Sequence, residues 1–410
     1  MDNWDNSIGR VALRSGTVQR VPPAIGPPVA TEPAVVVGSA VVAGSPVVAE
    51  PEVVAESPAH TGPPVVRGSE YAMLMRRVRQ AGLLERRVRY YVWVAGFAAA
   101  AWLAGWVAFV LVGDSWWQLA VAVALAVVFP QFAFLGHDAG HRQIFRTRRA
   151  NHLFGLIAGN LAIGVSIGWW TSNHNRHHAH PNTEDADPDI MGVLAHSDGR
   201  ARAGRGLRRL IFRYQAWLFF PMLLLEGWSL HGASAKAVAS WDIRDRFWEG
   251  ALLGAHALGY LIVVFGVLSP VKAVVFIAVQ QGLFGLYMGC TFAPNHKGMA
   301  VLTPGESADF LRRQVLTSRN VRGGRFTDIA LGGLNYQIEH HLFPAMPRPS
   351  LRRARPLVAR FCAERGVPYC ETGLLDSYSQ ALRHLNAVGK ATWPAEPEPV
   401  AAGAPKQPGA

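Results

Sequence analysis

Long apolar segments dominate the middle of the chain. Three arginines at 86, 87 and 89 precede an apolar segment at 90–112, and a second such segment follows at 116–136 after a short break. Each is long enough to cross a hydrocarbon core about 30 Å thick at about 1.5 Å per residue. Arginines follow the second segment, whereas the break at 113–115 carries no positive charge. The pattern predicts a transmembrane hairpin with both ends in the cytosol.

Three further apolar segments occupy 210–232, 250–268 and 271–293. If all three spanned the membrane, the histidine clusters before and after them would lie on opposite sides and could not meet. Residues 210–232 include Arg213, Pro221 and Glu226, so we interpret this segment as an interfacial helix. The other two then form a second hairpin that turns near residues 269–270. The apolar run at 153–170 is expected along the cytosolic boundary.

These patterns predict an all-α integral membrane protein. Four transmembrane helices form two hairpins, and a cytosolic helical cap completes a domain at residues 71–388. The flanking segments 1–70 and 389–410 are rich in Pro, Val and Ala without a helical period, so we expect disordered tails. The termini and the cap are expected on the cytosolic side of the cell's inner or plasma membrane.

Composition narrows the functional class. Half of the residues are hydrophobic and 17% are charged, with a net charge of +12. Because the arginines flank apolar segments, we assign this charge to membrane lipids and to a protein partner, and we expect no nucleic-acid binding. The three cysteines show neither zinc-type spacing nor an even-numbered disulfide framework.

Histidines gather in three short motifs with helical spacing. Residues three and four positions apart share one face of a helix, so each motif can direct two or three imidazoles to one place. The motifs HDAGH, HNRHH and QIEHH contain His137, His141, His174, His177, His178, Gln337, His340 and His341. Each lies beyond or between apolar spans, which predicts a metal site at the cytosolic boundary.

The number of imidazoles points to two metal ions. A zinc hydrolase uses about three protein ligands, and seven histidines exceed that number. No thiolates accompany them. Imidazole suits zinc, copper, iron or nickel, and an iron pair in a nitrogen-rich shell is suited to activating O2 for attack on an unactivated C–H bond.

The three motifs, in this order and separated by hairpins, resemble the membrane fatty acid desaturase family. The resemblance covers residues 85–365 and includes the surroundings GHDAGHRQIF, HNRHHAHPNTEDADPDI and NYQIEHHLFPAMPR. It implies an oxygen-dependent enzyme that forms a cis double bond in a long acyl chain carried on coenzyme A or a phospholipid. Gln337 in the third motif resembles the front-end desaturases.

The resemblance also implies a non-haem di-iron centre. Its ligands would be the seven histidines of the motifs and His296, which follows the last span as an additional ligand does in the family. Asn295 and Gln337 would assist directly or through water. Carboxylates that could accept the outer N–H of the ligands are Asp138, Asp185, Asp187, Asp189, Asp328 and Glu339. Trp169, Trp170 and Thr171 would line the acyl channel.

Electrons are expected from a separate ferredoxin-like or cytochrome protein with its own reductase, because neither an HPGG-type haem segment nor a dinucleotide-binding glycine fingerprint occurs. An acidic donor could dock on the arginines Arg148, Arg149, Arg208, Arg209, Arg312 and Arg313. Alternatives on the same scaffold are an acyl hydroxylase, an epoxygenase or a carotenoid hydroxylase, which would retain oxygen in the product. A non-enzymatic metal-binding or transport protein would instead place ionisable residues deep within the spans.

Overall fold

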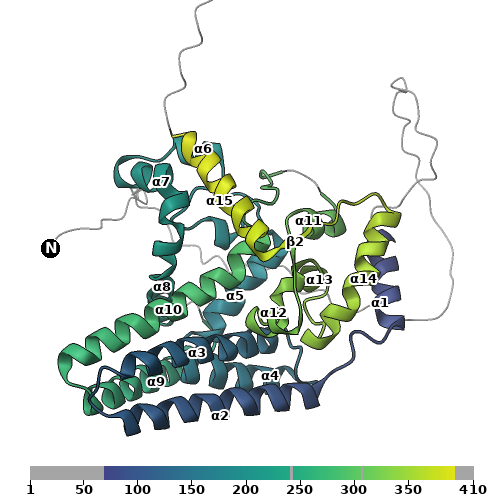
Figure 1. Ribbon diagram of the computed structural model, residues 1–410. Coiled ribbons are helices and arrows are strands. Elements are labelled where there is room, and N and C mark those ends of the chain that lie inside the picture. Colours follow the sequence, from purple (N-terminus) through teal and green to yellow (C-terminus); the bar gives the residue numbers. More distant parts are fainter. Residues whose placement is uncertain (1–68, 241–242, 306–307, 393–410) are drawn as a thin grey trace, which may run out of the picture. The chain divides into compact units, whose positions relative to one another are not determined.

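The computed structural model describes residues 69–240, 243–305 and 308–392. The tails expected at 1–70 and 389–410 lie almost entirely outside these residues and stay predictions. The described chain is mostly helical, as the sequence predicts (Figure 1).

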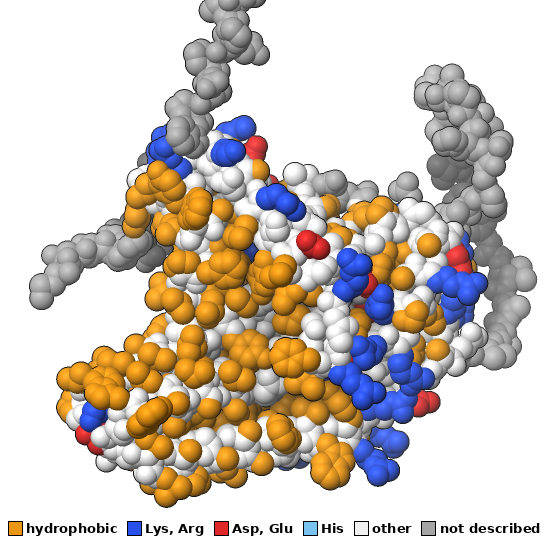
Figure 2. Space-filling model, in the orientation of Figure 1, with side chains coloured by type: hydrophobic (Ala, Val, Ile, Leu, Met, Phe, Trp, Pro, Cys, Tyr) orange, Lys and Arg blue, Asp and Glu red, His pale blue; other side chains and the backbone are white. Residues whose placement is uncertain are grey.

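Four of the described helices are long and apolar enough to cross a membrane. They are α2 (Val88–Val112), α3 (Gln118–Gly140), α9 (Arg246–Val267) and α10 (Pro270–His296). The prediction of four spans in two hairpins is therefore confirmed. Figure 2 shows apolar side chains over these helices, while basic side chains gather at the end nearest the remaining helices.

The two hairpins contribute one inner and one outer helix each. α3 and α10 pack against each other and bury about half of their most hydrophobic stretches, whereas α2 and α9 remain largely exposed. Phe129 and Phe284 meet edge-to-face between α3 and α10, with 5.9 Å between ring centroids. In contrast, Trp93 and Phe97 of α2 are 78% and 79% exposed, as expected of side chains that face lipid.

The tips of the two hairpins are joined by a polar contact. The carboxylate of Asp114 accepts hydrogen bonds from the backbone N–H and the hydroxyl of Ser269, at 2.9 and 3.1 Å. Lys272 forms an ion pair with the same carboxylate at 3.0 Å. These contacts link the turn of the first hairpin to the start of α10.

The segment expected to be one interfacial helix is split in two. α7 (Gly206–Leu223) and α8 (Glu226–Ala239) are separated by a turn at residues 224–225. Neither is among the candidate spans of the described chain. α7 runs across the direction of the long helices (Figure 1) and exposes Leu207 and Trp217 beside exposed arginines. This pattern fits a helix at the membrane interface.

The region 148–202, between the hairpins, bends several times. Its elements are α4 (Arg148–Gly155), the π-helical turn η1 (Leu156–Leu161), α5 (Ile167–Ala179), the 3₁₀ turn η2 (Pro188–Ile190) and α6 (Asp198–Arg202). The run expected along the boundary at 153–170 thus contains a π-turn and a non-helical break before α5.

A helical cap follows the second hairpin and packs on α1. The elements are α1 (Ser69–Gln80), α11 (Phe310–Leu316), β1 (Asn320–Arg322), α12 (Arg325–Ala330), η3 (Leu334–Tyr336), α13 (Gln337–Leu342), α14 (Arg348–Glu364), β2 (Glu371–Gly373) and α15 (Leu374–Lys390). Its apolar core includes Leu74, Val315 and Phe361. β1 and β2 form a short parallel pair, the one departure from the all-α prediction within the described residues.

Candidate metal centre

The first histidine motif ends α3. His137 lies in the last turn of this helix, and His141 follows directly after its end. The two ring centroids are 4.8 Å apart, as the spacing of four residues predicts. His137 is 4% exposed, because the end of α3 is buried under the cap.

The second motif lies on α5, which begins at Ser166. The Ser166 hydroxyl accepts a hydrogen bond from the Trp169 N–H at 3.0 Å and so caps the helix. From this start, α5 places His174 and His177 on a buried face. Asn175 lies between them in sequence and is exposed, so the helix directs its histidines inward and its other polar residues outward.

The third motif forms α13, a short helix whose residues are all buried. A tight turn at Gly332 and Gly333, both with positive φ, leads into it. A Cβ atom at Gly332 would lie 2.3 Å from the ring of Phe134 on α3, so only glycine permits this close approach. The turn therefore brings α13 against the end of α3, where the first motif lies.

The three motifs converge on a first group of imidazoles. The Nε2 atom of His340 lies 3.2 Å from that of His137 and 3.0 Å from that of His178. The Nε2 atoms of His178 and His174 are 3.1 Å apart. His141 belongs to the same group, since its ligand atom lies within 4.8 Å of those of His137, His174 and His340.

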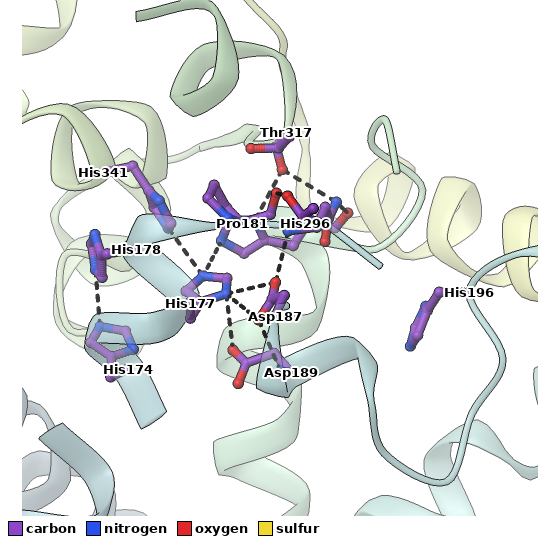
Figure 3. A network of polar contacts seen from close by, with 12 residues as sticks. His174, His177, His178, Pro181, Asp187, Asp189, His196, His296, Thr317 and His341 are labelled. Atoms are coloured by element: carbon purple, nitrogen blue, oxygen red, sulfur yellow. Dashed lines mark hydrogen bonds and ion pairs between the residues drawn. The ribbon is translucent and has the colours of Figure 1, made fainter. Parts of the chain in front are cut away.

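A second group surrounds His177. Its Nε2 atom lies 3.2 Å from Nε2 of His341 and 3.3 Å from Nε2 of His296, at the end of α10 (Figure 3). The side-chain amide of Gln337 is 2.9 Å from Nε2 of His296. Asn295 donates to the Gln337 oxygen at 3.3 Å. The structure thus brings His296 and Gln337 to the same place as two of the motifs.

In the second group, the hydrogen bonds of the Nδ1 atoms orient each ring so that its Nε2 atom faces the other histidines. Nδ1 of His177 points to Asp187 at 3.0 Å, Nδ1 of His341 to the side-chain oxygen of Gln314 at 2.9 Å, and Nδ1 of His296 to the carbonyl of Thr317 at 2.9 Å. Each Nδ1 is therefore a donor, and each Nε2 presents a lone pair.

The converging nitrogens of the second group have the spacing of ligands around one metal ion. Nitrogens about 2.0–2.1 Å from one metal ion lie about 2.9–3.4 Å apart, and the observed Nε2 separations fall in this range. In the first group, Nε2 of His141 is buried and has no hydrogen-bond partner among the described residues. Both groups therefore fit metal coordination. The eight imidazoles are not divided equally between them, because the first group has four or five and the second has three.

Burial prepares most of these imidazoles for metal binding. It lowers the pKa of His296 to about 3. It also lowers the pKa values of five other histidines well below the ordinary value, and neighbouring histidines add to the effect. The five are His141, His174, His178, His340 and His341. They are consequently neutral near pH 7, which is the form that binds a metal ion.

His177 differs from the other members of the site. Burial lowers its pKa, but Asp189 and Asp187 outweigh that effect and the net shift is upward. The carboxylate of Asp187 lies 3.0 Å from Nδ1 of His177 and that of Asp189 lies 3.4 Å from it. Figure 3 shows both residues beside the His177 ring. A carboxylate behind an imidazole orients the ring and makes it a stronger ligand.

The first group has a comparable support in Asp138. Its carboxylate lies 3.1 Å from Nδ1 of His137 and forms an ion pair with Arg348 at 2.7 Å. Arg348 comes from α14 and is 7% exposed, so it joins the cap to the end of α3. The sequence indicated Asp138 but gave no signal for Arg348.

Other expected supporting residues have different neighbours. The carboxylate of Glu339 accepts hydrogen bonds from the Tyr369 hydroxyl and the Asn320 amide, each at 2.7 Å, rather than from an imidazole of the motifs. Asp328 pairs with Arg352 at 3.3 Å. Both carboxylates therefore form contacts within the cap, Glu339 from α13 and Asp328 from α12, instead of with the histidine groups.

An apolar cavity reaches the first group. Its walls come from α3, η1, α5, α8 and α10, and His137 and Trp170 are part of them. Trp170 also stacks on His174, with 4.4 Å between ring centroids. Of the three residues expected along a channel, Trp170 lines this cavity, whereas Trp169 packs in the adjacent apolar core and Thr171 is not in the lining.

Comparisons with known proteins agree with this geometry. The family model described as "Fatty acid desaturase" matches residues 114–373, which contain all eight histidines of the two groups. The chain is 33% identical to an acyl-lipid (9-3)-desaturase of Physcomitrium patens over 283 residues, covering 67% of this chain and 54% of that protein.

Two nematode proteins show a comparable similarity. A Delta(6)-fatty-acid desaturase of Caenorhabditis elegans is 32% identical over 287 residues, which are 66% of this chain and 64% of that protein. A Delta(5) fatty acid desaturase of the same organism is 30% identical over 275 residues, or 64% of this chain and 61% of that protein. The chain therefore spans about half to two thirds of the length of these relatives.

Proposed function

Since the chain belongs to the fatty acid desaturase family, we propose that it is an oxygen-dependent oxidoreductase that introduces a cis double bond into a long acyl chain. The observation that carries this proposal is the convergence of eight imidazoles from three motifs and α10 on two adjacent groups, beside an apolar cavity.

The two groups would hold two non-haem irons. His137, His141, His174, His178 and His340 form the first set, and His177, His296 and His341 form the second with Gln337 beside it. Bound iron, with O2 as co-substrate, supplies the oxidising power that hydrogen removal from an acyl methylene requires. Burial keeps six of the imidazoles neutral, while Asp187, Gln314 and Asp138 orient the rings of His177, His341 and His137.

The apolar cavity would hold the acyl chain. Its lining includes Leu230, Phe284, Met288 and Phe292, which exclude water from the chain. Trp170 lies between this cavity and His174, so the chain would pass beside the first group. Fixing two neighbouring methylenes there is the main contribution that the protein makes to the reaction.

The substrate's carrier would be coenzyme A or a phospholipid, and the electron donor a separate ferredoxin-like or cytochrome protein. Among the arginines expected to form the docking face, Arg148 and Arg149 of α4 and Arg208 and Arg209 of α7 are exposed. Arg312 forms ion pairs with Glu70 and Asp309, at 2.8 and 2.7 Å, so it is less available to an acidic partner. We therefore assign the donor to the exposed arginines of α4 and α7. The termini and the cap would lie in the cytosol, with the spans in the inner or plasma membrane.

Expression in a desaturase-deficient host tests the function. Mass spectrometry of the cellular fatty acids should reveal a new double bond, whose position the fragmentation pattern reports, and His177→Ala should abolish it. Metal analysis of the purified chain should give about two irons. A hydroxylated product that retains oxygen would replace desaturation with hydroxylation, and stoichiometric zinc in an active sample would contradict the iron site.

A further inference from the structure

A non-helical break precedes α5, the helix that carries the second histidine motif. Residues 162–166 connect η1 to α5, and Gly164 in this break has a φ of +69°. η1 packs against α9 and α3, two of the membrane spans. Backbone groups at such a position must find partners within the protein, because lipid offers none.

Side chains of α8 and α9 provide those partners. His256 of α9 contacts the Leu161 carbonyl and His231 of α8 the Gly164 carbonyl, each through Nδ1 at 2.9 Å. The Ser234 hydroxyl accepts from the Ser166 N–H at 2.9 Å. The second hairpin and α8 therefore determine where the break lies.

Glu249 occupies the centre of this arrangement. It belongs to the first turn of α9 and is 1% exposed. Its carboxylate accepts hydrogen bonds from the Gly168 N–H at 3.1 Å, the Asn160 amide at 3.0 Å and the Ser166 hydroxyl. A carboxylate is an acceptor at every lone pair, so it matches three converging donors.

The same network satisfies the first N–H groups of α5. Gly168 donates to Glu249 itself, while Ile167 donates to Asn160 at 3.1 Å and Trp169 to Ser166 at 3.0 Å. Both of these acceptors are in turn bound to Glu249. A negative charge at a helix N-terminus is also favourable for the helix dipole.

The packing around Gly168, at the start of α5, is tight. A Cβ atom at Gly168 would lie 2.2 Å from Oε1 of Glu249 and 2.4 Å from the side chain of Ile243. The carboxylate thus lies directly against the backbone of α5. A short helix behaves as a rigid body. The position of the first turn of α5 therefore determines where His174 and His177 lie further along the helix.

We propose that Glu249 is a positioning residue for the second histidine motif, an inference that rests on the proposed metal site. It acts through the N-terminus of α5, which it links to the second hairpin. It touches neither the imidazoles nor the cavity. Loss of its charge shifts α5 and weakens metal binding in both histidine groups, since α5 contributes ligands to each.

The test compares iron release from the full-length chain in detergent. Glu249→Gln keeps the shape but places an amide N–H₂ against the donors of Asn160 or Ser166. We expect iron to pass to the chelator ferrozine about tenfold faster than from the wild type. The exchange variant Asn160→Asp/Glu249→Gln returns a carboxylate to the network, and release should fall to within about threefold of the wild type.

Asp245→Asn is the matched control. This carboxylate lies one turn before Glu249 and pairs at the surface with His152 at 3.1 Å, so its loss should leave iron release unchanged. A purely structural role of Glu249 would lower the unfolding temperature while the folded fraction released iron at the wild-type rate. Only protein that elutes as a single folded species is therefore compared.

Each outcome decides the proposal. Wild-type release from Glu249→Gln, or an exchange variant no slower than the single variant, overturns it. If Glu249→Gln gives no folded protein, Ser166→Ala removes one of the three contacts, and wild-type release from that variant overturns the proposal while faster release supports it. A wild-type chain without iron refutes the proposed metal site together with this inference, whereas the results above refute the inference alone.

Discussion

The side chain of Gln314 joins two of the histidine motifs. Its oxygen lies 2.9 Å from Nδ1 of His341, and its nitrogen donates to the carbonyl of His178 at 2.9 Å. Gln314 is fully buried on α11 and belongs to none of the motifs. It holds the His341 ring with Nε2 towards the centre and fixes the end of α5 at the same time.

Replacing Gln314 by leucine should weaken metal binding. His341 would lose the acceptor that fixes its tautomer, and partners of this kind contribute about 10–100-fold to metal affinity. We expect iron release to a chelator to accelerate by about that factor in Gln314→Leu. Gln314→Glu retains the acceptor for His341 but loses the donor to the His178 carbonyl, so its release should lie between those of the leucine variant and the wild type. Equal release from both variants would show that the amide has no such role.

His296 is expected to be a ligand of the second group. In His296→Ala, iron content should fall from about two to about one per chain, because two imidazoles are fewer than the three that hold such a metal. His341→Ala should give the same loss. His180 serves as the control, since it lies at the exposed end of α5, and His180→Ala should retain both irons. Full iron in His296→Ala would remove this residue from the site.

Leu230 should influence which acyl chains are accepted. It lines the apolar cavity from α8. Leu230→Ala would therefore enlarge the cavity for additional methylenes, and Leu230→Trp would make the cavity smaller. A methylene in an apolar pocket is worth about 1–3 kcal/mol. Competition between two chain lengths should therefore shift about tenfold towards the longer chain in the alanine variant and towards the shorter chain in the tryptophan variant.

Leu258 provides the matched control for this experiment. It lies on α9 and is 62% exposed on the protein surface, which faces lipid. Leu258→Ala should leave the product profile unchanged. An unchanged profile in all three variants would place the acyl chain outside this cavity.

Much of this structure could be predicted because the relevant signals are local in sequence. The membrane spans are visible as unbroken apolar segments. The histidines of each motif are three or four residues apart, so they lie on one face of a helix. The family resemblance also indicated His296, which lies at the end of α10 beside His177 and His341. Asp138 and Asp187 were predicted as supporting groups, whereas Gln314 and the Thr317 carbonyl were not, because these two meet their imidazoles only through tertiary folding. A neutral amide or a backbone carbonyl carries no signal in a sequence.

Charged residues were misinterpreted for a related reason. Glu339 lies between Gln337 and a ligand histidine, so the sequence suggested a contact with an imidazole. On α13, however, it faces Tyr369 and Asn320. Glu249 shows the reverse case. Near the start of an apolar segment it resembles an ordinary boundary charge, yet it is buried against α5.

The last prediction concerns the orientation of the chain in the membrane. The hairpin tips carry the paired Asp114 and Lys272, whereas the opposite ends of the spans carry many arginines, which favour the cytosol. With the three native cysteines replaced by alanine, Ser115→Cys in a hairpin tip should react with an impermeant maleimide in intact cells. Asp198→Cys, at the exposed start of α6, should react only after permeabilisation, because the chain between α3 and α9 should not cross the membrane. Labelling of Asp198→Cys in intact cells would mean that the chain crosses the bilayer between α3 and α6 and crosses back in α7 or α8. The histidine motifs would then not share the cytosolic side.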